Sequence, residues 1–102
     1  MNDISLEQMR QASLSACSLM KTMGNQDRLL LLCQLLQQEQ CVSDLEASVG
    51  ISQPTLSQQL AVLRQEGLVN TRRQGKQIYY QLASTEVVEM MALLQRLYCQ
   101  PS

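Results

Sequence analysis

The hydrophobic pattern of this chain changes its period at Gly67, and this change limits the possible folds more than any other feature. Before Gly67, Leu56, Leu60 and Leu63 recur at helical spacing, which is typical of one buried helix face. After it, β-branched and aromatic residues mark two strand-like segments, residues 68–72 and 77–82. A glycine-containing turn at residues 73–76 joins them. The pattern therefore predicts a mainly α fold with a small β-hairpin.

Five helices are predicted around this hairpin, each bounded by capping residues or glycine. They cover residues 5–23, 27–36, 43–49, 53–66 and 85–99. The expected N-caps are Asp27, Ser43 with Glu46 as its capping-box partner, Ser52, and either Ser84 or Thr85. Residues 29–33 are apolar on every side, so we expect the second helix to lie in the core.

The first and last helices both carry apolar stripes that a small domain has difficulty covering. The stripe residues recur three, four or seven positions apart: Leu6, Met9, Ala16, Met20 and Met23, then Val87, Met91, Leu94 and Tyr98. A chain of 102 residues builds only a modest core. We therefore expect residues 1–23 and 84–99 to pack against a second copy, as dimerisation helices.

Length and composition indicate one globular domain over residues 1–102, with 45% hydrophobic and 17% charged residues. The N-terminus has no signal-peptide pattern, and the longest apolar run is far too short to cross a bilayer. We expect a cytoplasmic protein without a membrane partner, in which cysteines are reduced, metal-bound or redox-active. The chain has no histidine, paired carboxylates or phosphate loop, so we expect neither enzyme activity nor a cofactor.

Positive charge is concentrated in the second half of an otherwise acidic chain. Residues 51–82 contain four basic residues and one acidic residue, a net charge of +3. The rest of the chain contains four basic and eight acidic residues, which brings the total to −1. A basic patch on an acidic body fits a surface that docks onto phosphate.

Two short helices in residues 43–66, followed by a basic hairpin in residues 68–82, have the order of a winged helix-turn-helix. The second of these helices buries a leucine stripe and presents short polar side chains outward, as a helix that reads base edges in the major groove requires. The hairpin supplies cations for the DNA backbone or the minor groove. The predicted DNA-binding residues are Ser52, Gln53, Thr55, Ser57, Gln58, Arg64, Arg72, Arg73, Lys76 and Gln77. We predict double-stranded DNA as the partner.

These segments, taken in order, resemble the ArsR/SmtB family of dimeric prokaryotic repressors over nearly the whole chain. The matching strings are Met23-Gly24-Asn25-Gln26-Asp27-Arg28-Leu29, Ser43-Asp44-Leu45, Ser52-Gln53-Pro54-Thr55-Leu56-Ser57-Gln58-Gln59-Leu60-Ala61-Val62-Leu63-Arg64 and Glu66-Gly67-Leu68-Val69. The resemblance implies a homodimer formed by the first and last helices. It also implies one recognition helix per half-site of an inverted-repeat operator.

Within that family the cysteines resemble those of the sulfide- and persulfide-responsive BigR/SqrR/HlyU branch. The matching strings are Arg28-Leu29-Leu30-Leu31-Leu32-Cys33 and Arg96-Leu97-Tyr98-Cys99. The branch pairs a cysteine of the second helix with one at the end of the last helix. The resemblance therefore implies that Cys33 and Cys99 form a dithiol whose oxidation or persulfidation switches operator binding, with oxidants or reactive sulfur species as inducers.

Two alternatives remain open at the level of the sequence. A thiolate metalloregulator of the As(III) or Cd(II) type is one, although the family string Cys-Val-Cys reads Cys41-Val42-Ser43 here and the chain has no histidine for a zinc site. A protein-interaction module without DNA or inducer is the other. Cys33 also suits an inert core position. We place Cys17 in dimer packing and Cys41 in a connecting turn.

Overall fold

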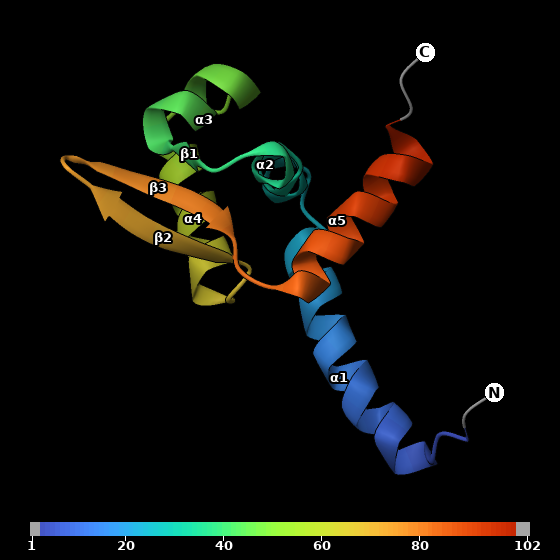
Figure 1. The fold of residues 1–102 in the computed structure, drawn as a ribbon. Coiled ribbons are helices and arrows are strands. Elements are labelled where there is room, and N and C mark those ends of the chain that lie inside the picture. The colour runs from blue at the N-terminus through green and yellow to red at the C-terminus, as the bar shows by residue number, and fades with distance from the viewer. Residues whose placement is uncertain (1–2, 100–102) are drawn as a thin grey trace.

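The computed structural model describes residues 3–99 and contains five helices and three strands in that range (Figure 1). The elements in chain order are α1 Leu6–Met23, α2 Gln26–Gln37, β1 Gln40–Cys41, α3 Val42–Val49, α4 Thr55–Gln65, β2 Val69–Gln74, β3 Gln77–Leu82 and α5 Thr85–Tyr98. This is the predicted order of helices with a hairpin between the last two. The domain is a winged helix-turn-helix.

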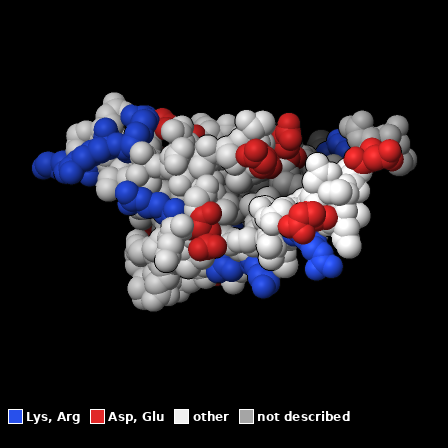
Figure 2. All heavy atoms as spheres, turned by 90° about the horizontal axis from the view of Figure 1, so that it is seen from below, with Lys and Arg blue, Asp and Glu red and all other residues white. Residues whose placement is uncertain are grey.

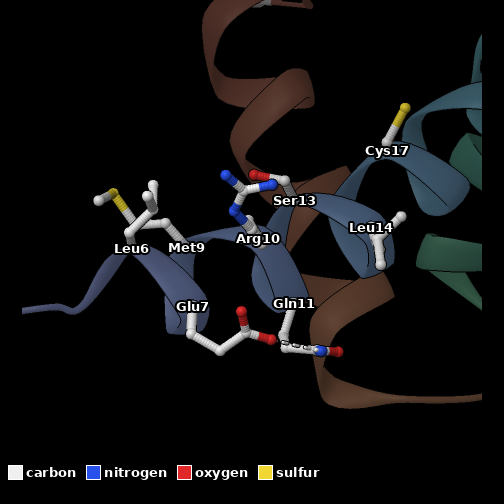
Figure 3. A pocket seen from close by; sticks show the side chains of 8 residues that line it. All are labelled: Leu6, Glu7, Met9, Arg10, Gln11, Ser13, Leu14 and Cys17. Carbon is white, nitrogen blue, oxygen red and sulfur yellow. Dashed lines mark hydrogen bonds between the residues drawn. The ribbon is translucent and has the colours of Figure 1, made fainter.

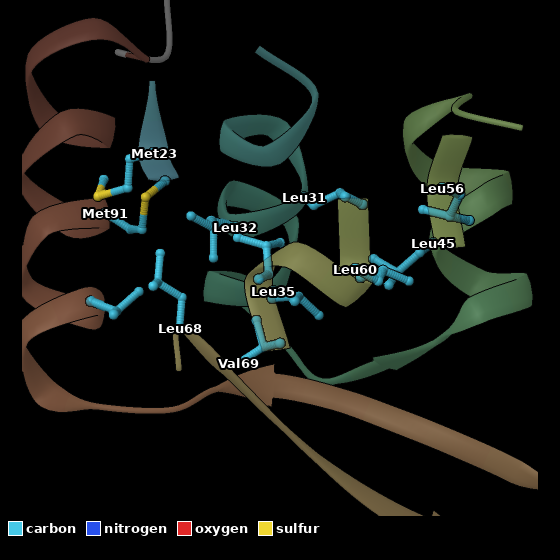
Figure 4. Close-up of a cluster of buried hydrophobic side chains, with 12 residues drawn as sticks. Met23, Leu31, Leu32, Leu35, Leu45, Leu56, Leu60, Leu68, Val69 and Met91 are labelled. Carbon is cyan, nitrogen blue, oxygen red and sulfur yellow. The ribbon is translucent and has the colours of Figure 1, made fainter. Parts of the chain in front are cut away.

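The core is built mainly from leucine, with methionine and valine, and lies around α2 (Figure 4). Leu31 and Leu32 of α2 are fully buried, and α2 contacts α3, α4, α5 and β3. The predicted stripe of α4 faces this core, and Leu56, Leu60 and Leu63 are at most 1% exposed. The prediction for α2 was only half right, because Leu30 lies on an outward face and is 43% exposed.

The hairpin belongs to a three-stranded antiparallel sheet with the order β1-β3-β2. Strand β2 extends to Gln74 and pairs with Gln77, so the turn contains only Gly75 and Lys76 rather than residues 73–76. Gly75 has φ +62°, a left-handed conformation that glycine adopts without steric cost. The strand β1 was not predicted: Gln40 pairs with Tyr80, and Cys41 pairs with Tyr79.

Three predicted helix caps are wrong, because a neighbouring residue or the fold takes the role. Asn25, rather than Asp27, accepts the backbone N–H of Arg28 at the start of α2. Helix α3 begins one residue after Cys41, so Ser43 lies inside it and forms no capping box. At α4 the side chain of Ser52 does not cap, and only its backbone carbonyl accepts, from Leu56.

The two terminal helices have the predicted bounds, but much of their apolar surface is uncovered. Ser5 caps α1 in a capping box with Gln8, and Ser84 caps α5. The second half of α1 packs against α2 and the start of α5, whereas the first half projects from the body (Figure 1). Tyr98, the last member of the predicted α5 stripe, is 81% exposed. Over the described residues, every helix is too short or too polar to cross a membrane.

Candidate functional site

The outer face of α4 and the turn before it carry the predicted base-reading residues. Their side chains are all exposed: Ser52, Gln53, Thr55, Ser57 and Gln58. The side-chain carbonyl of Gln53 accepts the backbone N–H of Ser57 at 3.2 Å and its hydroxyl at 2.6 Å, which arranges the first turn. The buried leucine stripe holds the helix, so this polar face points away from the core. Such a surface can offer donors and acceptors to base edges.

The wing carries the predicted cations, and they fall into two groups. Arg73 and Lys76 are exposed near the tip, where Arg73 Nε donates to the Gly75 carbonyl at 3.3 Å. Figure 2 shows Lys and Arg side chains gathered at the left end of the molecule, which is the hairpin end of Figure 1. Gln77, beside the turn, and Arg64, in the last turn of α4, are also exposed. These side chains are available to phosphate.

Arg72 differs from the other wing cations because it is held by neighbouring side chains. Its guanidinium forms a salt bridge with Glu39, and Nε donates to both carboxylate oxygens at 2.9 Å. Nη1 donates to Gln74 at 2.7 Å, and Cζ lies 4.7 Å from the ring centroid of Tyr79. The hydrogen bond from Arg72 holds the pKa of Glu39 below its usual value. This pair was not predicted from the sequence, because 33 positions separate its members.

Cys33 of α2 and Cys99 after α5 line one pocket, together with Leu29, Leu94, Gln95 and Tyr98. The pocket has a volume of about 330 Å³ and almost wholly apolar walls. Cys33 is half-buried, Cys99 is exposed, and both are free thiols. Burial raises the pKa of Cys33, and the nearby Cys99 thiolate raises it further. The more exposed Cys99 is therefore the better placed attacking thiol, and Cys33 the better placed resolving thiol.

The other two cysteines lie apart from this pocket. Cys41 is 4% exposed in β1, rather than in a connecting turn, and its sulfur lies 3.3 Å from the hydroxyl of Ser43. Burial of this thiol limits its access to an oxidant or persulfide. Among the described residues, no group of three or more His, Cys, Asp or Glu side chains lies close enough to hold a metal ion.

Cys17 is exposed and lines a groove along α1 (Figure 3). Every residue that lines the groove belongs to α1, including Leu6, Met9 and Leu14, so within one chain the other elements leave this face open. The three apolar side chains are 47–70% exposed. The face has the composition of an interface without its partner.

Comparison with known sequences identifies relatives of nearly the same length. The sequence model described as the bacterial regulatory proteins of the arsR family matches residues 25–71. The transcriptional activator HlyU of Vibrio cholerae is 47% identical over 97 residues, which cover 95% of this chain and 90% of that protein. The biofilm growth-associated repressor of Agrobacterium fabrum is 43% identical over 99 residues, which cover 97% of this chain and 85% of that protein.

Comparison with solved structures gives a consistent result. The structure of reduced HlyU from Vibrio cholerae superposes with a TM-score of 0.89 at 48% identity, over 93% of this chain and all of that chain. The repressor BigR from Xylella fastidiosa superposes with a TM-score of 0.86 at 40% identity, over 96% of this chain and all of that chain. These relatives are transcription regulators rather than enzymes.

Proposed function

The chain belongs to the ArsR family of bacterial regulatory proteins, in the branch of HlyU and BigR, and from this premise we propose a dithiol-switched homodimeric repressor. It is a DNA-binding transcription regulator. In our proposal it acts in the cytoplasm, and its two α4 helices read the half-sites of an inverted repeat. Oxidation or persulfidation of Cys33 and Cys99 releases the operator.

The observation that carries this proposal is the shared pocket of Cys33 and Cys99. The two residues are 66 positions apart, yet α2 and α5 present both thiols to one apolar volume. Two neighbouring thiols exchange sulfur through an attacking thiolate and a resolving thiol. An inert core cysteine does not require a second thiol beside it, so the pairing favours a switch.

The reaction with an organic persulfide, RSSH, takes two steps, over which atoms and electrons balance. The Cys99 thiolate attacks the terminal sulfur of RSSH, which forms Cys99–S–SH and releases RS⁻. Cys33 loses its proton and attacks Cys99 Sγ, which closes the disulfide and releases HS⁻. The protein loses two electrons and two protons, and the persulfide is reduced to RSH and H₂S.

The new bond reaches the DNA-reading elements through α2. Helix α2 contacts α4 and β3 as well as α5, so a covalent link between α2 and α5 restrains the scaffold of both the recognition helix and the wing. The half-sites of a symmetric operator lie about 34 Å apart along the duplex. A small reorientation of the two α4 helices therefore lowers operator affinity.

The deciding experiment titrates the DNA-bound protein with an organic persulfide, and separately with As(III) and Cd(II). We expect the persulfide to release the wild-type protein, and Cys33→Ser and Cys99→Ser to remain bound. Cys17→Ser is the matched control and is released like the wild type. Release of the Cys33→Ser or Cys99→Ser variant by the persulfide would refute the switch, and release by metal alone would favour the metalloregulator.

A further inference from the structure

Arg28, in the first turn of α2, hydrogen-bonds to two other helices. Its Nε donates to the backbone carbonyl of Thr22 near the end of α1 at 2.6 Å. Its Nη1 donates to the side-chain carbonyl of Gln59 on α4 at 3.0 Å. Arg28 and Gln59 are both half-buried, and Thr22 is buried. One guanidinium therefore joins the end of α1 to the middle of the recognition helix.

Arg28 and its acceptor on α1 are both held in place by further hydrogen bonds. The side chain of Asn25 accepts the backbone N–H of Arg28 at 3.0 Å, which fixes Arg28 at the start of α2. The Thr22 carbonyl belongs to the last turn of α1, where carbonyls lack helical partners and the helix dipole favours a cation. The hydroxyl of Thr22 donates to the Ser18 carbonyl at 3.2 Å.

The bridge supplies a directional restraint that the leucine stripe of α4 does not. Apolar contacts depend on the area that is buried rather than on direction, so alone they hold α4 on the core without fixing its rotation. The planar guanidinium holds its two acceptors along fixed directions. The side-chain carbonyl of Gln59 is also not available to a base, because it accepts the hydrogen bond from Arg28.

We propose that Arg28 and Gln59 are positioning residues that set the angle of the recognition helix relative to α1. The inference rests on the proposed function, in which α1 joins two copies and each α4 enters one half-site. A fixed angle between α1 and α4 then sets the separation of the two recognition helices. The consequence is selectivity for the spacing between half-sites, achieved by residues that do not touch DNA.

The test uses a duplex enriched by the wild-type protein from a random library. Derivatives of this duplex with one base pair inserted or removed between the half-sites measure spacing selectivity. The variants are Arg28→Gln, Gln59→Ala and the double variant, with Arg28→Lys as a charge-preserving change. Gln65→Ala is the matched control, because Gln65 is an exposed glutamine of α4 whose side chain has no hydrogen-bond partner among the described residues. Circular dichroism checks that each variant is folded.

We expect Arg28→Gln and Gln59→Ala each to weaken binding to the enriched duplex about tenfold. The double variant loses no more than Arg28→Gln alone, because the hydrogen bond between Arg28 and Gln59 is already absent from that variant. Spacing selectivity flattens, the salt dependence of binding stays at the wild-type slope, and Gln65→Ala binds like the wild type. Arg28→Lys reproduces the flattened selectivity, because its single ammonium lacks the fork that reaches both acceptors.

Other outcomes overturn the inference. Losses that multiply in the double variant would show that the residues act independently. A salt slope reduced by about one in Arg28→Gln would show that Arg28 contacts a phosphate. Unchanged spacing selectivity in folded variants would remove the positioning role while leaving the proposed function intact. Failure of the wild type to enrich any duplex would instead refute the DNA-binding function, and the inference with it.

Discussion

Helices α4 and α1 have the same kind of apolar stripe but opposite surroundings. On α4, Leu56, Leu60 and Leu63 are at most 1% exposed, because they belong to the core cluster with residues of α2, α3 and β2. On α1, Leu6 is 62% and Met20 is 61% exposed. The difference shows that helical spacing predicts which face needs cover, but leaves open whether that cover comes from the same chain.

The two regions therefore differ in whether a single chain buries their apolar side chains. The DNA-reading region, from α3 to β3, folds on a core within one chain. The face of α1 leaves Leu6, Met9 and Leu14 47–70% exposed, and its cover comes from a second copy in the function we propose. Four measurements test this contrast, from the largest expected effect to the smallest.

Leu60→Ala is expected to have the largest effect, on the stability of the single chain. Leu60 is 1% exposed, so the change leaves a cavity in the core and lowers the free energy of unfolding by about 2–5 kcal/mol. Denaturant titration measures the loss. Leu60→Met keeps the side-chain volume and should cost less than about 1.5 kcal/mol. A mild effect of Leu60→Ala would mean that α4 is not firmly packed.

Leu14→Glu is expected to affect association rather than folding. Burial of a leucine side chain contributes about 1.5–3 kcal/mol, so loss of Leu14 from the interface should raise the dimer dissociation constant about tenfold or more. Sedimentation equilibrium measures this constant. Ala12→Glu, on the same helix but outside the groove, is the control. If Leu14→Glu stays as dimeric as the wild type, the groove of α1 is not the interface.

The wing cations are expected to contribute unequally to DNA binding. Arg73→Ala and Lys76→Ala should each reduce the slope of log affinity against log salt by about one, because each removes a phosphate contact. Arg72→Ala should change the slope less, because Glu39 already pairs with Arg72. Titrations at several salt concentrations measure these slopes. Equal slopes for the three variants would show that DNA displaces Glu39 from Arg72.

Cys33 is partly buried and packs against the core, and its titration is expected to have the smallest effect. Its pKa is raised above 9.0 in the folded protein, so the unfolded chain ionises first as the pH rises. The stability from this group is complete below pH 9.0 and is lost above it, at less than about 1.4 kcal/mol per pH unit. The loss is measured as the difference between wild type and Cys33→Ser in unfolding from pH 8 to 10. An identical pH profile for Cys33→Ser would contradict the raised pKa.

The sequence predicted the features that depend on local spacing. The stripe of α4, the two main strands and the bounds of α1 and α5 were confirmed, because each follows from a periodic run of side chains. The caps failed where several polar residues adjoin. Asn25 and Asp27 both suit a helix start, and local chemistry does not choose between them.

Features that depend on distant segments were beyond local patterns. Strand β1 has two residues and exists only because Tyr79 and Tyr80 lie beside it. Glu39 directly precedes β1, so the pairing of β1 with β3 also brings Glu39 to Arg72 of β2. No spacing rule places Cys33 beside Cys99, and that expectation came from family resemblance. The roles of these residues, and of the predicted DNA contacts, remain predictions.

Strand β1 also determines how the wing can move. It pairs with Tyr79 and Tyr80, so only the middle of the hairpin has three strands. Beyond Ile78 the ribbon has two strands and ends in a two-residue turn. The middle of the wing is therefore joined through β1 to the segment that follows α2, whereas the tip is held only by the pairing of β2 with β3. On a duplex, the tip can adjust to the local width of the groove. A displacement of α2 is passed through β1 to the middle of β3, and so changes the position of the whole wing.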